Sequence, residues 1–326
     1  MEKILLSNSD LEVSRLCFGG CPMGGYGWGD VSRDELIQAI NEAIDIGVNF
    51  FDSADTYGLG EGERTLGEAL GSKRNKAVIG TKFGVRVENG KTFYDNSPEW
   101  INKALEQSLK RLNTDYIDLY QVHYRDGITP ISDVIDTLES LKKKGLIRYY
   151  GLSNIHQNDI EELKEHIGKF VSFQDEYSLA SRKNEDDMFA LSEELKLTPL
   201  TWGSLGQGIL SGKYDINSKF DSNDRRSRDI YVNFHGDKLA HNLNIVESMK
   251  KISREIDKPI PSIALRWILD YIPNSVVIAG IKNKKQLYSN ASALGWNLSK
   301  EQIDILKKVS DYGNVVDGRE VAATNE

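Results

Sequence analysis

Cysteines and long apolar runs are scarce in this sequence, and basic residues are outnumbered by acidic ones. Only two cysteines occur among 326 residues, Cys17 and Cys21, which is too few for a disulfide framework or a four-sulfur metal site. Their spacing would permit a redox pair, but we interpret them as small buried side chains near a strand end. No apolar run approaches the roughly 20 residues that span a bilayer, and the segment MEKILLSNSD lacks the basic and apolar regions of a signal peptide. We therefore expect a cytoplasmic protein without a membrane segment.

The charge balance bears on the class of partner. The chain has 41 Lys and Arg against 49 Asp and Glu, which gives a formal net charge of -8. Nucleic-acid backbones are bound through clustered Lys and Arg, so we expect no nucleic-acid partner. With 39% hydrophobic and 28% charged residues, the composition is that of a soluble globular protein with enough apolar material for a large core.

Short apolar runs alternate with amphipathic helical stretches along the chain, which is the pattern of a parallel sheet with crossover helices. Eight runs are apolar enough to be strands buried on both faces, at residues 16–20, 49–54, 78–84, 116–123, 149–154, 170–177, 197–205 and 276–282. Helical patterns occur between them, for example at 32–46, 98–112, 131–144, 159–166 and 184–195. No linker or break in composition divides the chain. We therefore predict a single (β/α)8 TIM barrel domain over residues 1–326.

Two additions interrupt the repeat. Residues 3–6 and 11–14 flank a turn at 8–10, which predicts an N-terminal β-hairpin that closes the lower end of the barrel. Residues 206–240 contain several glycines and the charged segment DSNDRRSRD before the helical pattern resumes near His241. A loop of this length in a barrel is a lid or binding loop, or else disordered.

Active sites of such barrels form at the carboxyl ends of the strands, so polar residues at those ends are the candidates for chemistry. The second strand ends near Asp52 with Tyr57 just beyond it, the third contains Lys82, and the fourth ends in His123. Each of these except Lys82 has an ordinary structural explanation when it is considered alone. A lysine in a strand buried on both faces is costly unless it is paired or reaches solvent.

These four residue types together can deliver a proton. Tyrosine has an unperturbed pKa of about 10, and a neighbouring ammonium favours its phenolate, a role that Lys82 could fill. Asp52 would hold and neutralise the lysine, and His123 could hydrogen-bond a substrate oxygen and orient it. The set fits a reduction in which hydride reaches a carbonyl carbon while a proton reaches its oxygen.

The segments FFDSADTYG, GTKFG, YQVH, GLSN and FQDEYSL resemble successive motifs of the aldo-keto reductase superfamily. They occur in the family's order, and the match runs from about residue 15 to residue 295. The spacing of five between Asp52 and Tyr57 is also the family's. The resemblance implies that Asp52, Tyr57, Lys82 and His123 form the catalytic tetrad of an enzyme that reduces an aldehyde or ketone to an alcohol, with Tyr57 as the acid.

The same resemblance implies a set of cofactor contacts and a cofactor-clamping loop after the seventh strand. Ser153, Asn154 and Gln174 match positions that hold the nicotinamide carboxamide, and Trp202 matches the aromatic residue that stacks on the ring. The remaining contacts fall on the clamping loop and after the last strand: Ser204, Leu205, Gly206 and Gly208 near the pyrophosphate, then Gly280, Lys282 at the 2'-phosphate, and Gln286 and Asn290 near the adenine.

The resemblance favours NADPH, with NADH less favoured. Lys282 stands where arginine is commoner, and a lysine offers a point charge in place of a bidentate fork. A Rossmann cofactor site is excluded because no G-x-G-x-x-G segment lies between a strand and a helix in register.

Other functions remain open at this point. A cofactor-sensing regulatory subunit is the main alternative, because the potassium-channel β subunits have this fold and this tetrad; the acidic charge and the lack of an extended amino-terminal arm favour an enzyme. Metal-dependent chemistry is not expected, because the other histidines lie on predicted helices or the long loop: His156, His166, His235 and His241. The substrate would be a small carbonyl compound, such as an aldehyde, a ketone, a quinone-like compound or a keto sugar. We expect its cavity to be bordered by Tyr26, Trp28, Tyr124 and Arg125.

Overall fold

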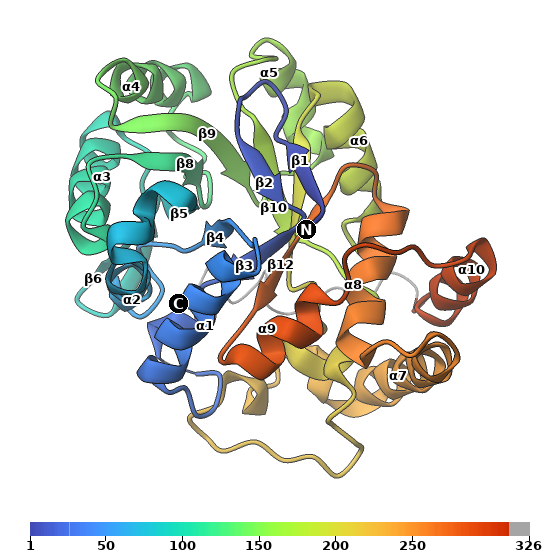
Figure 1. Ribbon diagram of the computed structural model, residues 1–326. Helices are drawn as coiled ribbons and strands as arrows, with labels where there is room; N and C mark the ends of the chain where they lie inside the picture. The colour runs from blue at the N-terminus through green and yellow to red at the C-terminus, as the bar shows by residue number, and fades with distance from the viewer. Residues whose placement is uncertain (26, 313–326) are drawn as a thin grey trace.

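Eight parallel strands close into a barrel in the computed structural model, which describes residues 1–25 and 27–312 (Figure 1). Going round the barrel, the strands are β3 (Leu16–Gly19), β4 (Phe50–Asp52), β5 (Val78–Phe83), β8 (Ile117–Val122), β9 (Ile147–Ser153), β10 (Ser172–Glu176), β11 (Thr198–Trp202) and β12 (Val276–Gly280). The last strand pairs with the first, with Gly280 opposite Gly19. The predicted (β/α)8 barrel is confirmed. Seven of the eight predicted runs contain one of these strands, and the run at 149–154 overlaps β9, which begins two residues earlier, at Ile147.

The helices surround this barrel as an outer ring (Figure 1). They are α1 (Arg33–Asp45), α2 (Glu61–Leu70), α3 (Pro98–Leu112), α4 (Ile131–Lys143), α5 (Ile160–Lys164), α6 (Glu185–Leu195), α7 (Gly236–Ile256), α8 (Ile260–Tyr271), α9 (Lys284–Ala291) and α10 (Lys300–Val309). Local signals set their starts: the Ser32 side chain accepts a hydrogen bond from the Glu35 N–H, and Pro98 is the first residue of α3. No helix of the described residues is long and apolar enough to cross a membrane.

The N-terminal hairpin closes one end of the barrel, as predicted. Its strands are β1 (Lys3–Leu5) and β2 (Glu12–Ser14), which pair in antiparallel fashion. Leu6, Leu11 and Val13 are buried in one apolar cluster with Cys17 and Phe50 from the starts of barrel strands. The interior is therefore a packed core at this end, and the opposite, carboxyl-terminal end is where a site can form.

The structure contains a second hairpin that the sequence analysis did not predict. Strands β6 (Val85–Glu88) and β7 (Lys91–Tyr94) pair in antiparallel fashion after β5. Asn89 and Gly90 form the turn, with φ of 52° and 74°. An Asn-Gly pair between short alternating runs is a strong hairpin signal, because both residues tolerate positive φ.

The long loop after β11 is shorter and more structured than predicted. It holds the 3-10 helices η4 (Gly206–Ser211), η5 (Arg225–Ser227) and η6 (Val232–Phe234). Helix α7 begins at Gly236, so the prediction that helix resumes near His241 was wrong. The first three residues of this helix, Gly236, Asp237 and Lys238, include no apolar side chain that could begin a helical period. We call residues 206–235 the strap.

Candidate active site

The four candidate residues for chemistry come together at the carboxyl-terminal end of the barrel. Asp52 is the last residue of β4, and Tyr57 lies in the loop that leads to α2. Lys82 is on β5 and His123 directly follows β8. Strands β4, β5 and β8 are neighbours in the barrel, which explains why residues up to 71 positions apart in the sequence share one site.

Lys82 and Asp52 form a buried ion pair. The Lys82 Nζ lies 2.7 and 2.8 Å from the two carboxylate oxygens of Asp52 and donates to the Ser53 carbonyl at 2.8 Å. The two residues are 1% and 2% exposed. Gln174 Nε2 also donates to Asp52, at 2.9 Å. A buried ammonium with three oxygen partners is held in one position. The cost of a lysine in a strand buried on both faces is thus offset by pairing.

Tyr57 meets this pair at its hydroxyl. Lys82 Nζ lies 3.4 Å from the Tyr57 oxygen. Burial, and then the charge of Asp52, hold the pKa of Tyr57 well above its usual value of 10.0. The pKa of Tyr57 is therefore raised and not lowered as the sequence predicted, because burial and the charge of Asp52 both disfavour the phenolate. Tyr57 therefore keeps its proton at neutral pH, as a proton donor must, and Lys82 is close enough to stabilise the oxygen once the proton leaves.

His123 is neutral in this site. Burial, and then the charge of Lys82, lower its pKa well below 6.5. Its Nδ1 is buried and has no hydrogen-bond partner among the described residues. The His123 and Tyr57 rings lie 6.3 Å apart, edge to face. A neutral imidazole beside the Tyr57 ring can donate one hydrogen bond to an oxygen placed between them.

The residues expected at the nicotinamide adjoin the tetrad and hold it in place. Asn154 Nδ2 donates to the His123 carbonyl at 2.9 Å, and the Ser153 hydroxyl donates to the Gln174 carbonyl at 2.9 Å. Ser153 ends β9 and Gln174 lies on the neighbouring strand β10, where the two are paired. Trp202 ends β11 and is partly buried. The structure thus places all four of these residues along one arc of the barrel mouth.

Ser204 has a structural role in this structure. Its hydroxyl donates to the Thr201 carbonyl at 2.7 Å and to the Ile278 carbonyl at 3.1 Å, and the residue is buried. These bonds join the end of β11 to β12.

The glycines at the start of the strap shape a tight turn. Gly206 and Gly208 have φ of 55° and 103°. Their N–H groups donate to the Gly203 and Leu205 carbonyls, at 2.7 and 2.9 Å. Positive φ at two closely spaced positions favours glycine, because a Cβ there would strain the backbone.

Lys282 lies among other cations just after β12 and its terminal residue Gly280. Its Nζ donates to the Trp28 carbonyl, and the side chain is half-buried. Burial, and then the charges of Arg226 and Lys213, lower the pKa of Lys282. The charges of Asp224 and Asp30 act in the opposite direction. The three cations outnumber these two carboxylates, so the region suits an anion such as a phosphate.

The two residues expected near the adenine follow on α9. The Gln286 side chain accepts a hydrogen bond from the Lys282 N–H at 2.9 Å. Asn290 is buried, and its Nδ2 has no hydrogen-bond partner among the described residues. A buried amide donor without an acceptor fits a ligand that brings one.

Two arginines of the strap belong to this site and were not predicted. The Arg225 N–H donates to the Gly27 carbonyl at 2.9 Å, which fastens the strap to the loop after β3. The charge of Arg225 also acts to lower the pKa of Tyr57. Arg226 is buried and bonds Asp224 through Nε at 2.8 Å. The segment DSNDRRSRD was the available signal, but its charges give no indication of which side chains turn inward.

The residues expected around the substrate have different positions. Trp28 donates from its indole N–H to the Cys21 sulfur at 3.1 Å, and the Tyr124 ring stacks on His123 at 5.1 Å. Both therefore lie at the mouth. Arg125 instead pairs with Glu162 at 2.5 Å, on the side of α5. Tyr26 lies outside the described residues.

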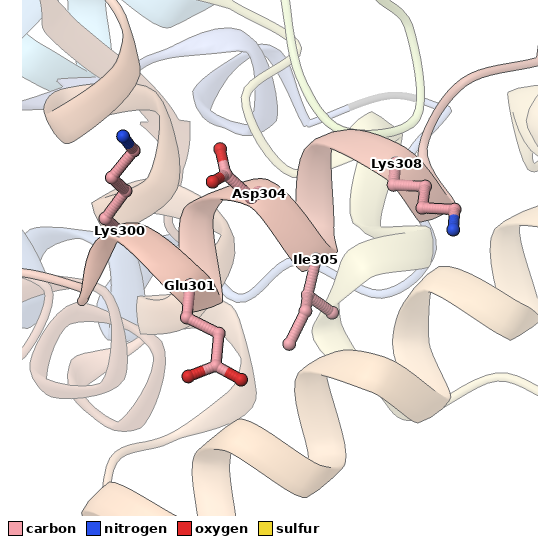
Figure 2. A pocket seen from close by; sticks show the side chains of 5 residues that line it. All are labelled: Lys300, Glu301, Asp304, Ile305 and Lys308. Atoms are coloured by element: carbon pink, nitrogen blue, oxygen red, sulfur yellow. The ribbon is translucent and has the colours of Figure 1, made fainter.

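A separate surface hollow lies on α10 (Figure 2). One face of this helix lines it, with Lys300, Glu301, Asp304, Ile305 and Lys308. Helix α10 packs on α7 and α8 and contributes none of the tetrad residues. The hollow is therefore distinct from the barrel mouth.

Comparisons with known proteins cover nearly the whole chain. Residues 15–311 match the model described as the Aldo/keto reductase family. The chain is 32% identical to the Schizosaccharomyces pombe aldo-keto reductase yakc, named for NADP(+), over 92% of this chain and 89% of that protein. It is 28% identical to an Escherichia coli NADH-specific methylglyoxal reductase, over 95% and 99%. A solved structure of a Gluconobacter oxydans glycerol dehydrogenase has a TM-score of 0.85 at 30% identity and covers 94% of each chain.

Proposed function

The chain belongs to the aldo/keto reductase family, and from this premise we propose that it reduces the aldehyde or ketone group of a small molecule to an alcohol with NADPH. The observation that carries the proposal is the position of Tyr57, whose hydroxyl lies 3.4 Å from a lysine that is itself fixed by a buried aspartate. This arrangement keeps a proton on the phenol until a substrate oxygen can take it.

The protein's own residues handle the proton. A substrate oxygen placed between Tyr57 and His123 accepts hydrogen bonds from the phenol and the neutral imidazole, which polarises the carbonyl. NADPH, when bound, supplies the hydride to the carbonyl carbon. Tyr57 gives its proton to the oxygen, and Lys82 stabilises the phenolate that forms. Asp52 holds the Lys82 side chain in position during the transfer.

The site has features that suit a phosphorylated dinucleotide. Ser153, Asn154 and Gln174 would hold the carboxamide, and Trp202 would lie against the nicotinamide ring. At the other end, the cations around Lys282 suit a 2'-phosphate, and the unpartnered Asn290 Nδ2 suits an adenine acceptor. The cation cluster is the reason for proposing NADPH over NADH.

The regulatory subunit remains the competing function, because a sensor could bind NADPH through the same residues. The test is oxidation of NADPH and of NADH by the purified chain across methylglyoxal, dihydroxyacetone, an aromatic aldehyde, a quinone and a keto sugar. We expect at least one compound to turn over at roughly 1 s⁻¹ or faster with NADPH, as is usual for enzymes. Tight NADPH binding, measured by fluorescence, with no turnover of any compound would favour the sensor.

A further inference from the structure

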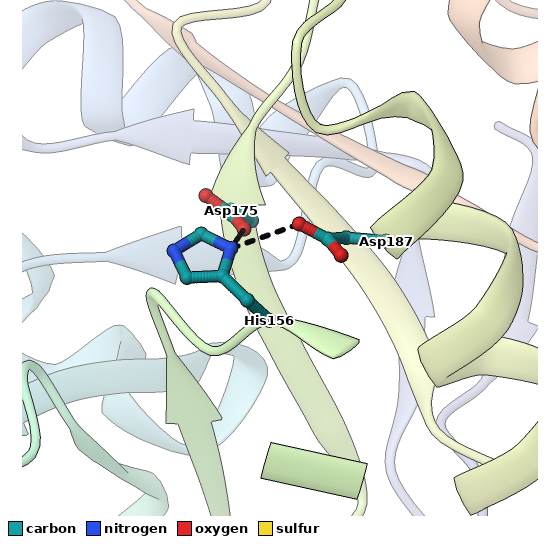
Figure 3. A group of neighbouring side chains, drawn as sticks. All are labelled: His156, Asp175 and Asp187. Carbon is teal, nitrogen blue, oxygen red and sulfur yellow. Dashed lines mark hydrogen bonds and ion pairs between the residues drawn. The ribbon is translucent and has the colours of Figure 1, made fainter. Parts of the chain in front are cut away.

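Three side chains that the mechanism does not use meet outside the barrel wall (Figure 3). His156 precedes η3 (Gln157–Asp159), Asp175 is on β10 and Asp187 is on α6. Successive side chains of a strand point to opposite faces. Gln174 faces the interior, where it reaches Asp52, so Asp175 faces outward, toward the helices.

The potential ligand atoms are close enough to share one ion. His156 Nδ1 lies 2.8 Å from Asp187 Oδ2 and 3.7 Å from Asp175 Oδ2, and all three atoms lie within 4.8 Å of one another. Zinc binds histidine nitrogen and carboxylate oxygen at about 2.0 to 2.2 Å, which places tetrahedral ligands roughly 3.3 Å apart. Small side-chain rotations are enough to bring the three atoms to that spacing.

Asp175 supplies an independent indication that a cation belongs here. The residue is only 2% exposed, and its Oδ1 accepts from the Glu176 N–H and from Asn184 Nδ2 at 2.7 and 2.9 Å. Its Oδ2, which points at His156, has no hydrogen-bond partner among the described residues. A buried carboxylate oxygen without a donor is costly unless a cation or proton meets it.

The second carboxylate is held in a similar way. Asp187 accepts the Gln157 N–H on Oδ1 at 3.1 Å, which leaves Oδ2 directed at His156. The backbone N–H of His156 donates to Asp159 Oδ2 at 2.8 Å, and this bond fixes the loop that carries the imidazole. Hydrogen bonds that orient the ligands from behind are typical of protein metal sites.

We propose that His156, Asp175 and Asp187 bind one divalent cation of the zinc type, with water completing its coordination. One imidazole with two carboxylates suits zinc and its neighbours in the first transition row better than magnesium or calcium, which prefer oxygen alone. The His156 side chain is 45% exposed, which gives the ion a path from solvent. The site does not depend on the proposed reductase activity, because none of its ligands belongs to the tetrad.

Calorimetric titration of the chelator-treated, full-length chain with zinc chloride tests the site. We expect one equivalent to bind the wild-type protein. Affinity should fall at least about tenfold in Asp187→Asn and in Asp175→Asn, each of which keeps the shape of the side chain. His166→Ala removes a histidine outside the cluster and should bind like the wild type. Absence of zinc binding to the wild type, or wild-type zinc affinity in both aspartate variants, would overturn the proposal.

A second measurement distinguishes this site from the two cysteines. Cobalt substituted for zinc should give the visible bands of a nitrogen and oxygen ligand set, without the strong ultraviolet band of a thiolate ligand. Zinc should also raise the midpoint of thermal unfolding of the wild type, because the ion joins β10, α6 and the loop before η3. Magnesium should not raise it. A thiolate band, or the same zinc-dependent shift in a folded Asp187→Asn protein, would place the ion elsewhere and contradict the assignment.

Discussion

At the scale of single residues, Tyr57, Lys82 and Asp52 each have a different role in the proton transfer that we propose. Burial keeps the Tyr57 phenol protonated. The Lys82 ammonium lies close enough to stabilise the negative charge that would develop on the phenol oxygen when the proton leaves. The ion pair with Asp52 offsets the cost of burying the Lys82 ammonium and fixes its position. The pKa of His123 is lowered, so in the proposed reaction a neutral imidazole would orient the substrate oxygen without adding charge.

These protonation states predict the pH dependence of the reaction. The pKa of Tyr57 is raised from 10.0, so the phenol loses its proton only above that value. The pKa of His123 is lowered from 6.5, so the imidazole gains a proton only below that value. We therefore expect kcat/KM for a non-ionising carbonyl substrate to be flat between about pH 7 and 9. NADPH affinity, measured over the same pH range, is the control. If kcat/KM fell with a midpoint between pH 7 and 9 while NADPH affinity stayed constant, the pKa of Tyr57 would be lowered and not raised, which would contradict the prediction.

Lys282 should decide between the two cofactors. Lys282→Ala removes a charge proposed to meet the 2'-phosphate, so NADPH should bind roughly 10 to 100 times more weakly, as expected for the loss of a hydrogen bond to a charged group. NADH, which has no such phosphate, should bind nearly as before. Fluorescence titration with both cofactors measures this.

Lys284→Ala is the matched control, because Lys284 pairs with Glu42 on the surface at 2.9 Å. It should leave both affinities unchanged. An equal loss of NADPH and NADH in Lys282→Ala would show that the lysine has another role.

From the sequence, candidate catalytic residues could be predicted only where they lie at the carboxyl ends of predicted strands. Asp52, Tyr57, Lys82 and His123 lie where parallel strands deliver them, so their meeting follows from the barrel. Arg225 could not be found in this way, because its place depends on how the strap crosses to Gly27. The cluster of His156 with two aspartates was missed for a similar reason, since its members come from three separate elements without a recognisable spacing.

At the scale of elements, the strap is the part that departs most from a plain barrel. Arg226 organises it: the guanidinium bonds Asp224 and the Tyr214 hydroxyl and lies 4.8 Å from the centre of the Phe220 ring. A buried arginine with these partners holds the strap in one conformation over the region of Lys282. We infer that the strap retains a bound cofactor.

Loosening the strap should therefore act on both cofactors. Arg226→Ala should speed dissociation of NADPH and of NADH, because it removes the internal support of the strap. The effect on NADPH should be at least as large as that on NADH, because Arg226 is also one of the cations near Lys282. Stopped-flow displacement of the bound cofactor measures the rate. Lys219→Ala, an exposed change in the same segment, should have no effect. Unchanged dissociation in Arg226→Ala would mean that the strap does not retain the cofactor.

The elements differ in how far the sequence predicts them. The barrel strands were found because each is a short apolar run between helical patterns. The β6–β7 hairpin has its own sequence signal in Asn89 and Gly90. It lies outside the repeat of strands and helices, so the repeat does not predict it. The start of α7 was misplaced because its first three residues, Gly236, Asp237 and Lys238, include no apolar side chain.

At the scale of the whole molecule, the N-terminal part of the chain contacts the last part of the barrel in two places. Strand β12 pairs with β3, and below the barrel Glu2 Oε2 accepts from Arg266 Nη1 and from the Gly295 N–H, each at 2.8 Å. Arg266 is only 1% exposed and has Asp270 as its other acidic partner. The first residues of the chain thus satisfy a buried charge on α8.

Glu2→Ala should consequently destabilise the whole barrel. It leaves part of a buried guanidinium without its acceptor, which costs about 1 to 3 kcal/mol. Urea denaturation followed by circular dichroism measures the loss. Glu12→Ala is the control, because the Lys3–Glu12 pair is exposed and should contribute less than about 1 kcal/mol. Equal stability of the two variants would show that the Glu2 contacts do not help to close the ring.

The overall architecture is the level that the sequence predicts most fully. Eight apolar runs with helices between them leave few arrangements other than a closed parallel barrel, and the N-terminal hairpin has the apolar residues needed to cover one end. What periodicity cannot supply is the direction of individual polar side chains, such as Arg125, which turns to the acids of α5 and η3.

The central claim is that Tyr57 delivers the proton to the substrate oxygen, and Tyr57→Phe tests it most directly. Turnover of the best carbonyl substrate should fall by roughly 10² to 10⁴, the usual contribution of a general acid, while NADPH affinity and the midpoint of thermal unfolding stay close to wild type. Wild-type turnover in a folded, NADPH-binding Tyr57→Phe protein would contradict the account.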